Sequence, residues 1–81
     1  MKILNTATLG NNIQQIRIKC KLTQEETVAQ LQVLGSPISR STYSLIELGR
    51  GNIFVSDLVA LQEVFGVDYS EFFIDIPTSR E

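Results

Sequence analysis

The stretch Leu22-Thr23-Gln24-Glu25-Glu26 constrains the fold of this chain more than any other part of it. Thr23 followed three residues later by Glu26 is a capping box, in which the threonine hydroxyl accepts one free helix N–H and the glutamate reaches back to another. Further along, Ser39 is suited to cap a second helix, and Gly49 is suited to end it in the left-handed conformation. This order predicts two short helices joined by a turn.

Apolar residues at helical spacing extend this pattern to five short helices. We expect the first from Leu9 onward, the second from about Gln24 to Leu34 and the third from about Arg40 to Leu48. A fourth follows Ser56 and Asp57, which form a favourable N-terminal cap, and Asp68 with Glu71 introduces a fifth. The expected inward residues are Leu9, Ile13, Ile16, Cys20, Val28, Leu31, Leu34, Tyr43, Ile46, Leu58, Leu61 and Phe65.

The sequence therefore predicts an all-α fold. Residues 1–8 lack periodicity and are interpreted as an N-terminal arm, residues 9–74 as one domain, and residues 75–81 as a C-terminal tail. No strand pattern is evident. A chain of 81 residues with 43% hydrophobic residues is large enough for one core.

Composition excludes several classes of function. The single cysteine, Cys20, cannot form an internal disulfide and is interpreted as a small core residue, and the absence of histidine removes the ordinary general base. We find no candidate catalytic or metal site, expect no enzyme, and see no cofactor or small-molecule ligand implied. The apolar runs are too short to span a membrane and the N-terminus lacks a signal-peptide core, so a cytoplasmic protein is expected.

The net charge of −2 argues mildly against nucleic acid, but its distribution argues the other way. Residues 1–50 carry six basic and three acidic residues, a balance of +3, whereas residues 51–81 carry one basic and six acidic residues, a balance of −5. Such polarity suits a small protein with one side facing DNA and the other facing away.

Taken together, the capping box at Thr23, the run Ser39-Arg40-Ser41-Thr42-Tyr43 and the run Ile46-Glu47-Leu48-Gly49 resemble the DNA-binding helix-turn-helix domain of the Cro and phage-repressor type, the XRE family. The resemblance runs from about Leu9 to Phe73. It implies a lambda-repressor-like domain, with the helix-turn-helix in the second and third helices, in a bacterial or phage-encoded transcription regulator.

The resemblance also implies a set of DNA contacts. Gln24 stands where the family has a phosphate-binding glutamine, and Arg50 and Asn52 lie in the loop whose donors reach phosphates in relatives. The base-reading side of the third helix would consist of Arg40, Ser41, Ser44 and Leu45. Leu45 replaces a polar residue often found there, so it either meets a thymine methyl group or packs against a neighbouring chain or helix.

Three further features bear on the fold. Arg17 and Glu47 match a partly buried ion pair of many relatives and would fix the third helix against the first. Lys21 stands where a glycine commonly ends the first helix, so either it adopts a left-handed conformation or the helix closes differently. The segment 32–38 is longer than is usual in the family by about one helical turn, which lengthens either the second helix or the turn.

We expect sequence-specific binding to double-stranded DNA by a homodimer on a pseudo-palindromic operator, because symmetric half-sites multiply specificity. The apolar residues 53–55 together with Phe72 and Phe73 exceed what one small core can absorb. This excess predicts a dimer surface made from Ile53, Phe54, Phe72 and Phe73. The alternative is a protein-interaction module on the same scaffold, like an antitoxin or an anti-repressor, which the net acidity, Leu45 and the apolar segment 53–55 favour.

Overall fold

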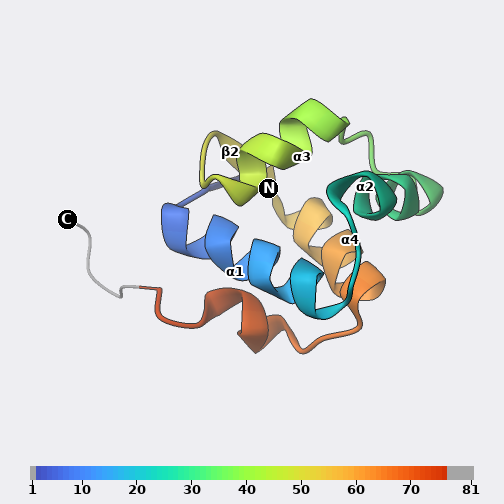
Figure 1. Cartoon of the computed structure of the whole chain (residues 1–81). Coiled ribbons are helices and arrows are strands. Elements are labelled where there is room, and N and C mark those ends of the chain that lie inside the picture. Colours follow the sequence, from blue (N-terminus) through green and yellow to red (C-terminus); the bar gives the residue numbers. More distant parts are fainter. Residues whose placement is uncertain (1, 77–81) are drawn as a thin grey trace.

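The computed structural model describes residues 2–76, so most of the expected C-terminal tail lies outside the described residues. The elements follow in the order β1 (Lys2–Leu4), α1 (Ala7–Lys19), α2 (Gln24–Val33), α3 (Arg40–Glu47), β2 (Asn52–Phe54), α4 (Val55–Phe65) and η1 (Tyr69–Phe73). In Figure 1, α1 lies across the middle of the molecule, with α3 on one side of it and η1 on the other. The predicted all-α helix-turn-helix class is confirmed, although η1 is a 3-10 helix and not an α-helix.

Two short strands are a difference from the sequence-based expectation. Residues Lys2–Leu4 pair antiparallel with Asn52–Phe54, where we expected an irregular arm and no strand. Each strand has only three residues, which is too short for an alternating pattern to be recognised in a sequence. The pairing depends on the chain returning beside its own N-terminus after α3, so local sequence does not reveal it.

Asn5 fastens the N-terminal segment to α3. Its side chain is buried, and its Nδ2 donates a hydrogen bond of 2.8 Å to the carbonyl oxygen of Ile46. Thr6 then caps α1 by accepting a hydrogen bond from the N–H of Leu9 at 3.1 Å. Helix α1 therefore begins two residues before the expected start at Leu9.

Gly10 allows α1 and α3 to cross closely. A Cβ atom at this position would lie 2.5 Å from the carbonyl oxygen of Ile46 and 2.6 Å from the backbone nitrogen of Gly49. Only a residue without a side chain fits there, because backbone atoms cannot move aside as a flexible side chain can. No pattern in the local sequence around Gly10 indicates this contact, because its partners lie in α3 and the turn after it.

The helix caps show how local sequence sets the helix boundaries. Both halves of the predicted capping box are present, since Thr23 Oγ1 accepts from the Glu26 N–H at 3.0 Å and Glu26 Oε1 accepts from the Thr23 N–H at 2.9 Å. The Ser39 hydroxyl accepts from the N–H of Thr42 at 3.2 Å, as a cap of α3 should. The expectation for Ser56 was wrong, because α4 begins at Val55 and its first turn is closed by the Asp57 carboxylate.

The ends of the first two helices show which conformation Lys21 adopts and where the additional residues of segment 32–38 lie. Lys21 adopts the left-handed conformation, with φ of 59°, and its N–H donates to the carbonyl oxygen of Ile18. Helix α2 ends at Val33 and is followed by Gly35, whose φ is 92°. The additional residues therefore enlarge the connection to α3, and within this connection Ile38 is buried against the core.

One hydrophobic core lies between the helices. Its buried members are Leu9, Ile13, Ile16, Val28, Leu31, Ile38, Tyr43, Ile46, Ile53, Leu58, Leu61, Phe65 and Phe72. Of the expected inward residues, Leu34 was wrong, because it follows the end of α2 and is exposed. Cys20 is half-buried against the same core.

None of the helices between residues 2 and 76 is both long enough and apolar enough to cross a membrane.

Candidate nucleic-acid interface

Helix α3 lies along an outer edge of the molecule and presents one face outward (Figure 1). Its buried residues Tyr43, Ile46 and Glu47 face α1 and the core. With about 3.6 residues per turn, the opposite side of the helix must be the outward one. That outward face consists of Arg40, Ser41, Ser44, Leu45 and the C-terminal cap residue Leu48, of which only Ser44 is partly buried.

The ion pair between Arg17 and Glu47 joins α1 to α3. Arg17 Nε donates to Glu47 Oε2 at 2.6 Å, and its Nη2 donates to Glu47 Oε1 at 3.1 Å, so the contact is bidentate. The side chain of Arg17 is 13% exposed and that of Glu47 only 2%. A parallel pair of charge-assisted hydrogen bonds fixes the orientation as well as the separation of the two groups.

The charge on Glu47 is stabilised although it is buried. Burial by itself would raise the pKa of Glu47, but Arg17, the adjacent Tyr43 hydroxyl and Gln24 together more than offset this effect, and the net shift of its pKa is downward. The same pair raises the pKa of Arg17, chiefly through the hydrogen bond to Glu47. Both groups therefore remain ionised at neutral pH.

Gln24 connects this ion pair to the start of α3. Its Nε2 donates to Glu47 Oε1 at 2.9 Å, and its Oε1 accepts a hydrogen bond of 3.1 Å from Arg40 Nε. Two residues that the sequence analysis named separately, Gln24 and Arg40, are thus in direct contact. Their contact follows from the placement of the first turn of α2 beside the first turn of α3, which no spacing in the sequence reveals.

Arg50 lies beyond the opposite end of α3. Its N–H donates to the carbonyl oxygen of Leu45 at 3.0 Å, and both flanking glycines, Gly49 and Gly51, have positive φ values of 78° and 74°. The side chain of Arg50 is exposed. Since α3 has eight residues and is therefore about 12 Å long, Arg40 and Arg50 place one cationic side chain at each of its ends.

Asn52 starts strand β2, where we had expected a turn. It is exposed and lines a groove of about 200 Å³ together with Thr42 of α3 and Phe54. The groove runs along the side of α3 and not across its outward face, because Thr42 is not one of the outward residues. Asn52 is therefore beside the candidate interface, whereas Arg50 is at its end.

The expected dimer surface needs correction. Ile53 and Phe72 are both fully buried, at 0% exposed, and belong to the core, so neither can form a surface. Phe54 and Phe73 are each about half exposed, at 50% and 46%. Alternation in β2 explains why Ile53 is buried while Phe54 is exposed, because neighbouring residues of a strand point to opposite sides.

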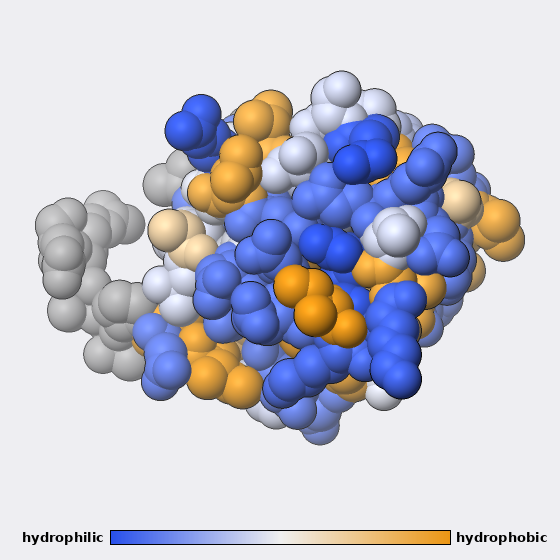
Figure 2. Space-filling view, viewed as in Figure 1, coloured by the Kyte–Doolittle hydropathy of each residue, from blue (hydrophilic) through white to orange (hydrophobic). Residues whose placement is uncertain are grey.

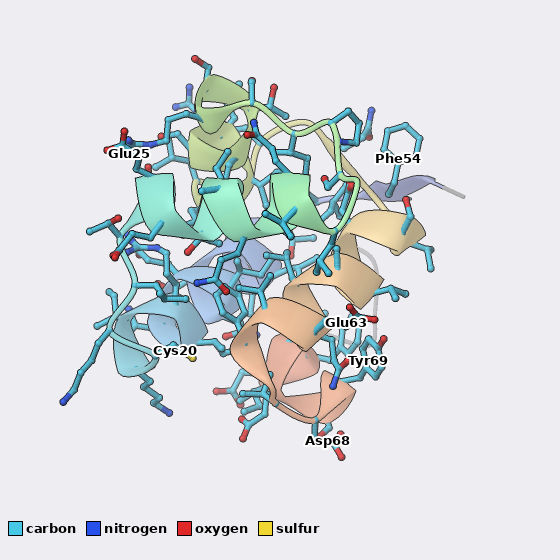
Figure 3. All side chains as sticks on the ribbon, turned by 90° about the vertical axis from the view of Figure 1, so that its right-hand side faces the viewer. Cys20, Glu25, Phe54, Glu63, Asp68 and Tyr69 are labelled. Carbon is cyan, nitrogen blue, oxygen red and sulfur yellow. The ribbon has the colours of Figure 1, made fainter. Side chains whose placement is uncertain are left out.

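The two exposed phenylalanines, Phe54 and Phe73, do not form a single patch with each other. Phe54 belongs to β2 and Phe73 to η1, and these elements lie on opposite sides of α1 in Figure 1. Figure 2 likewise shows apolar surface in several separate areas within a mostly hydrophilic face. In Figure 3 the ring of Phe54 extends from the edge of the molecule near β1.

Acidic side chains lie on several sides of the molecule, and Asp57 lines the groove beside α3. In Figure 3, Asp68, just before η1, lies at the end of the molecule opposite to α3, whereas Glu63 on α4 lies at mid-height and Glu25 on α2 lies close to α3. Glu47 is the only acidic residue of α3, and it is turned inward and paired. Among residues 2–76, no group of three or more acidic or cysteine side chains could hold a metal ion.

A short α2 joined by a turn to an α3 with an open outward face, which has one arginine at each end, defines a helix-turn-helix DNA-binding protein. The model of the helix-turn-helix family of the Cro and phage-repressor type matches residues 13–72. The chain therefore belongs to this family, the XRE family, and is a DNA-binding regulator of that type. A search of the curated proteins finds no match.

Proposed function

We propose that this protein regulates transcription as a homodimer that binds a pseudo-palindromic operator, with α3 of each subunit in the major groove. The outward face of α3 carries this proposal. Its one carboxylate, that of Glu47, is withdrawn from the face by Arg17 and Gln24, so no negative charge opposes the DNA there. A major groove of B-DNA admits an α-helix whose exposed side chains reach the base edges.

The base-reading role falls to the outward side chains of α3. Arg40 can donate two hydrogen bonds to one guanine, and Ser41 and Ser44 can donate to or accept from several base edges. The hydrogen bond from Arg40 to Gln24 supports this role, because it limits the rotamers of a long side chain before DNA arrives. The side chain of Arg40 is therefore restricted to fewer conformations in the free protein, and it loses less conformational entropy when it binds DNA.

Phosphate binding is assigned to both ends of α3. Gln24 is the first residue of α2, where free N–H groups and the helix dipole attract an anion. Arg50 supplies a positive charge beyond the C-terminus of α3, and Asn52 adds an amide donor beside it. Contacts of this kind orient the protein on the duplex without reading its sequence.

The dimer surface is assigned to the neighbourhood of Phe54. Its exposed ring lies next to the two-stranded sheet and lines the groove beside α3, so a symmetric contact there would bring the two recognition helices near each other. Recognition helices of such dimers lie about 34 Å apart, which is one turn of duplex. Phe73, on the other side of α1, serves as the comparison.

Two measurements test the proposal. Binding to random duplex DNA is measured by gel shift over a range of salt concentrations, and we expect log K to fall by about 0.9 per phosphate neutralised for each unit of log salt. Sedimentation at micromolar concentration is compared for the wild type, Phe54→Glu and Phe73→Glu, and we expect only Phe54→Glu to abolish the dimer.

The alternative, a protein-interaction module, predicts a different result. It gains support from the exposed leucines Leu45 and Leu48 on α3. A chain that binds no duplex even at low salt would favour it and would end the proposal of operator binding. A chain that binds DNA but remains a monomer at every concentration, on and off DNA, would retain α3 as the recognition helix and reject the dimer.

A further inference from the structure

The outward face of α3 has an apolar part, which includes Leu48 in addition to the predicted Leu45. The side chains of Leu45 and Leu48 are 46% and 61% exposed. They are three residues apart, so they are neighbours on the helix surface. Leu48 lies one turn beyond Ser44 and two turns beyond Arg40, which places it at the C-terminal end of the outward face, on the same side as Arg50.

Neither leucine is needed for the core. Helix α3 contributes Tyr43 and Ile46 to the core from its other side, and both are almost completely buried. The exposed pair instead lies between the two cationic side chains Arg40 and Arg50. In such an arrangement the two arginines would attract the phosphates of a polyanion, and the two leucines would meet an apolar group that lies between those phosphates.

We propose that Leu45 and Leu48 read the 5-methyl groups of thymines in two neighbouring base pairs; this inference rests on the proposed placement of α3 in the major groove. Thymine is the base that displays an apolar methyl group there, and the minor groove displays none. Three residues of α-helix span about 4.5 Å along the axis, against about 3.4 Å between successive base pairs. The separation of the two leucines is therefore of the same order as one base-pair step, so the two side chains would meet neighbouring base pairs.

The remaining side chains of α3 leave this task to the leucines. Adenine is ordinarily read by Asn or Gln and cytosine by Asp or Glu, and the sequence of α3, RSTYSLIE, contains no amide side chain and only the inward Glu47. Arg40 favours guanine, and serine discriminates weakly. Preference for A·T pairs must then come mainly from apolar contact with thymine.

Deoxyuridine provides the test, because it differs from thymidine only by the missing methyl group. Preferred sequences are selected from a random duplex pool with the full chain, and each thymine of the enriched site is then replaced in turn by deoxyuridine. We expect thymines at two adjacent base pairs to be enriched, and the loss of either methyl group to weaken binding about fourfold, as for one buried CH₂ group.

Variants assign each methyl group to its leucine. In Leu48→Ala, one of the two thymines should lose its sensitivity to deoxyuridine while the other retains it, and Leu45→Ala should do the converse. Val33→Ala is the matched control, because Val33 is an exposed apolar residue at the end of α2, away from α3. It should leave both sensitivities unchanged, and melting curves check that all variants fold.

The outcomes separate this inference from the function on which it rests. Salt-dependent binding in which no deoxyuridine substitution weakens the complex, or whose sensitivity is the same in both leucine variants, would overturn the reading of thymine and leave DNA binding intact. Absence of any binding to duplex would overturn the proposed function itself.

Discussion

Arg17 on α1 and Glu47 on α3 form a bidentate ion pair, with Nε 2.6 Å from Oε2, in a place where almost no water reaches the carboxylate. The pair joins α1, which packs against the core, to α3, which has one face turned outward. Because Glu47 also accepts from Gln24, the same carboxylate holds the start of α2. The orientation of α3 therefore depends on one buried charge and its two donors.

Removal of Arg17 should destabilise the protein more than removal of an ordinary surface charge. Arg17→Met leaves the Glu47 carboxylate buried without its cation, and we expect a loss of about 3 kcal/mol in the free energy of unfolding. Urea denaturation measures the loss. Lys19→Met, an exposed position of the same helix, is the control and should change stability by less than about 0.5 kcal/mol. Equal effects of the two variants would contradict the structural role of the pair.

The ion pair should also make stability depend on pH in the acid range. The folded-state pKa of Glu47 is lowered from its ordinary value of 4.5, so its contribution is fully present above that value and is lost as the pH falls through the folded-state pKa. The stability difference between the wild type and Glu47→Gln should be constant from pH 7 to about pH 5.5 and should shrink below about pH 4.5. A difference that is the same at pH 3 and pH 7 would show that Glu47 is not ionised in the fold.

Removal of the Tyr43 hydroxyl, unlike removal of Arg17, should not reduce stability. Its hydroxyl is buried beside the ion pair and has no hydrogen-bond partner among the described residues, and burial raises the pKa of Tyr43. An unsatisfied buried hydroxyl costs about 1 to 3 kcal/mol, so Tyr43→Phe should leave stability unchanged or increase it. Thermal denaturation measures this. A loss above about 1 kcal/mol would indicate that the hydroxyl makes a hydrogen bond in solution.

Gly10→Ala should be strongly destabilising although it improves helix propensity. Alanine in an open helix position is favoured over glycine by about 1 kcal/mol, whereas a Cβ at Gly10 would lie 2.5 Å from the Ile46 carbonyl oxygen. Because α1 and α3 would have to separate, we expect a net loss of at least about 2 kcal/mol. The exposed neighbour Asn11→Ala is the control and should be neutral or mildly stabilising. Stabilisation by Gly10→Ala would contradict the close crossing.

The two arginines at the ends of α3 should affect DNA binding differently. Arg50→Ala should weaken binding to all duplexes about equally and reduce the salt slope by about 0.9, because it removes one phosphate contact. Arg40→Ala should mainly relax the base preference at one position. Gel shifts on the selected site and on random duplex, each at several salt concentrations, distinguish the two. If the two variants had the same effect on both duplexes, the assignment of separate roles would be wrong.

Much of the helical framework could be predicted from local sequence. The capping box of Thr23 with Glu26 and the cap at Ser39 set the starts of α2 and α3, because each cap is a hydrogen bond between residues three positions apart. Apolar spacing likewise identified core residues such as Ile13 and Leu61. Residues this close in sequence meet whatever the rest of the chain does.

Contacts between distant segments were decided by the tertiary structure. The strand Lys2–Leu4 exists because it pairs with Asn52–Phe54, and Gly10 is required because α3 crosses above it. Among four apolar candidates for a dimer surface, Ile53 and Phe72 became core while Phe54 and Phe73 remained exposed. Hydrophobicity alone cannot make that choice, since burial depends on which side of an element meets its neighbours.

The features of the candidate site also fall into those set by local sequence and those set by tertiary packing. The sequence by itself determined which side chains α3 carries and where its helix begins and ends, because propensity, capping and periodicity act within a turn or two. The resemblance already implied the partly buried pair of Arg17 and Glu47, which is present, but only the tertiary structure decided that Gln24 meets Arg40 and that Leu48 joins the outward face. These relationships depend on how α1, α2 and α3 pack, and packing is a property of the whole core and not of any one segment.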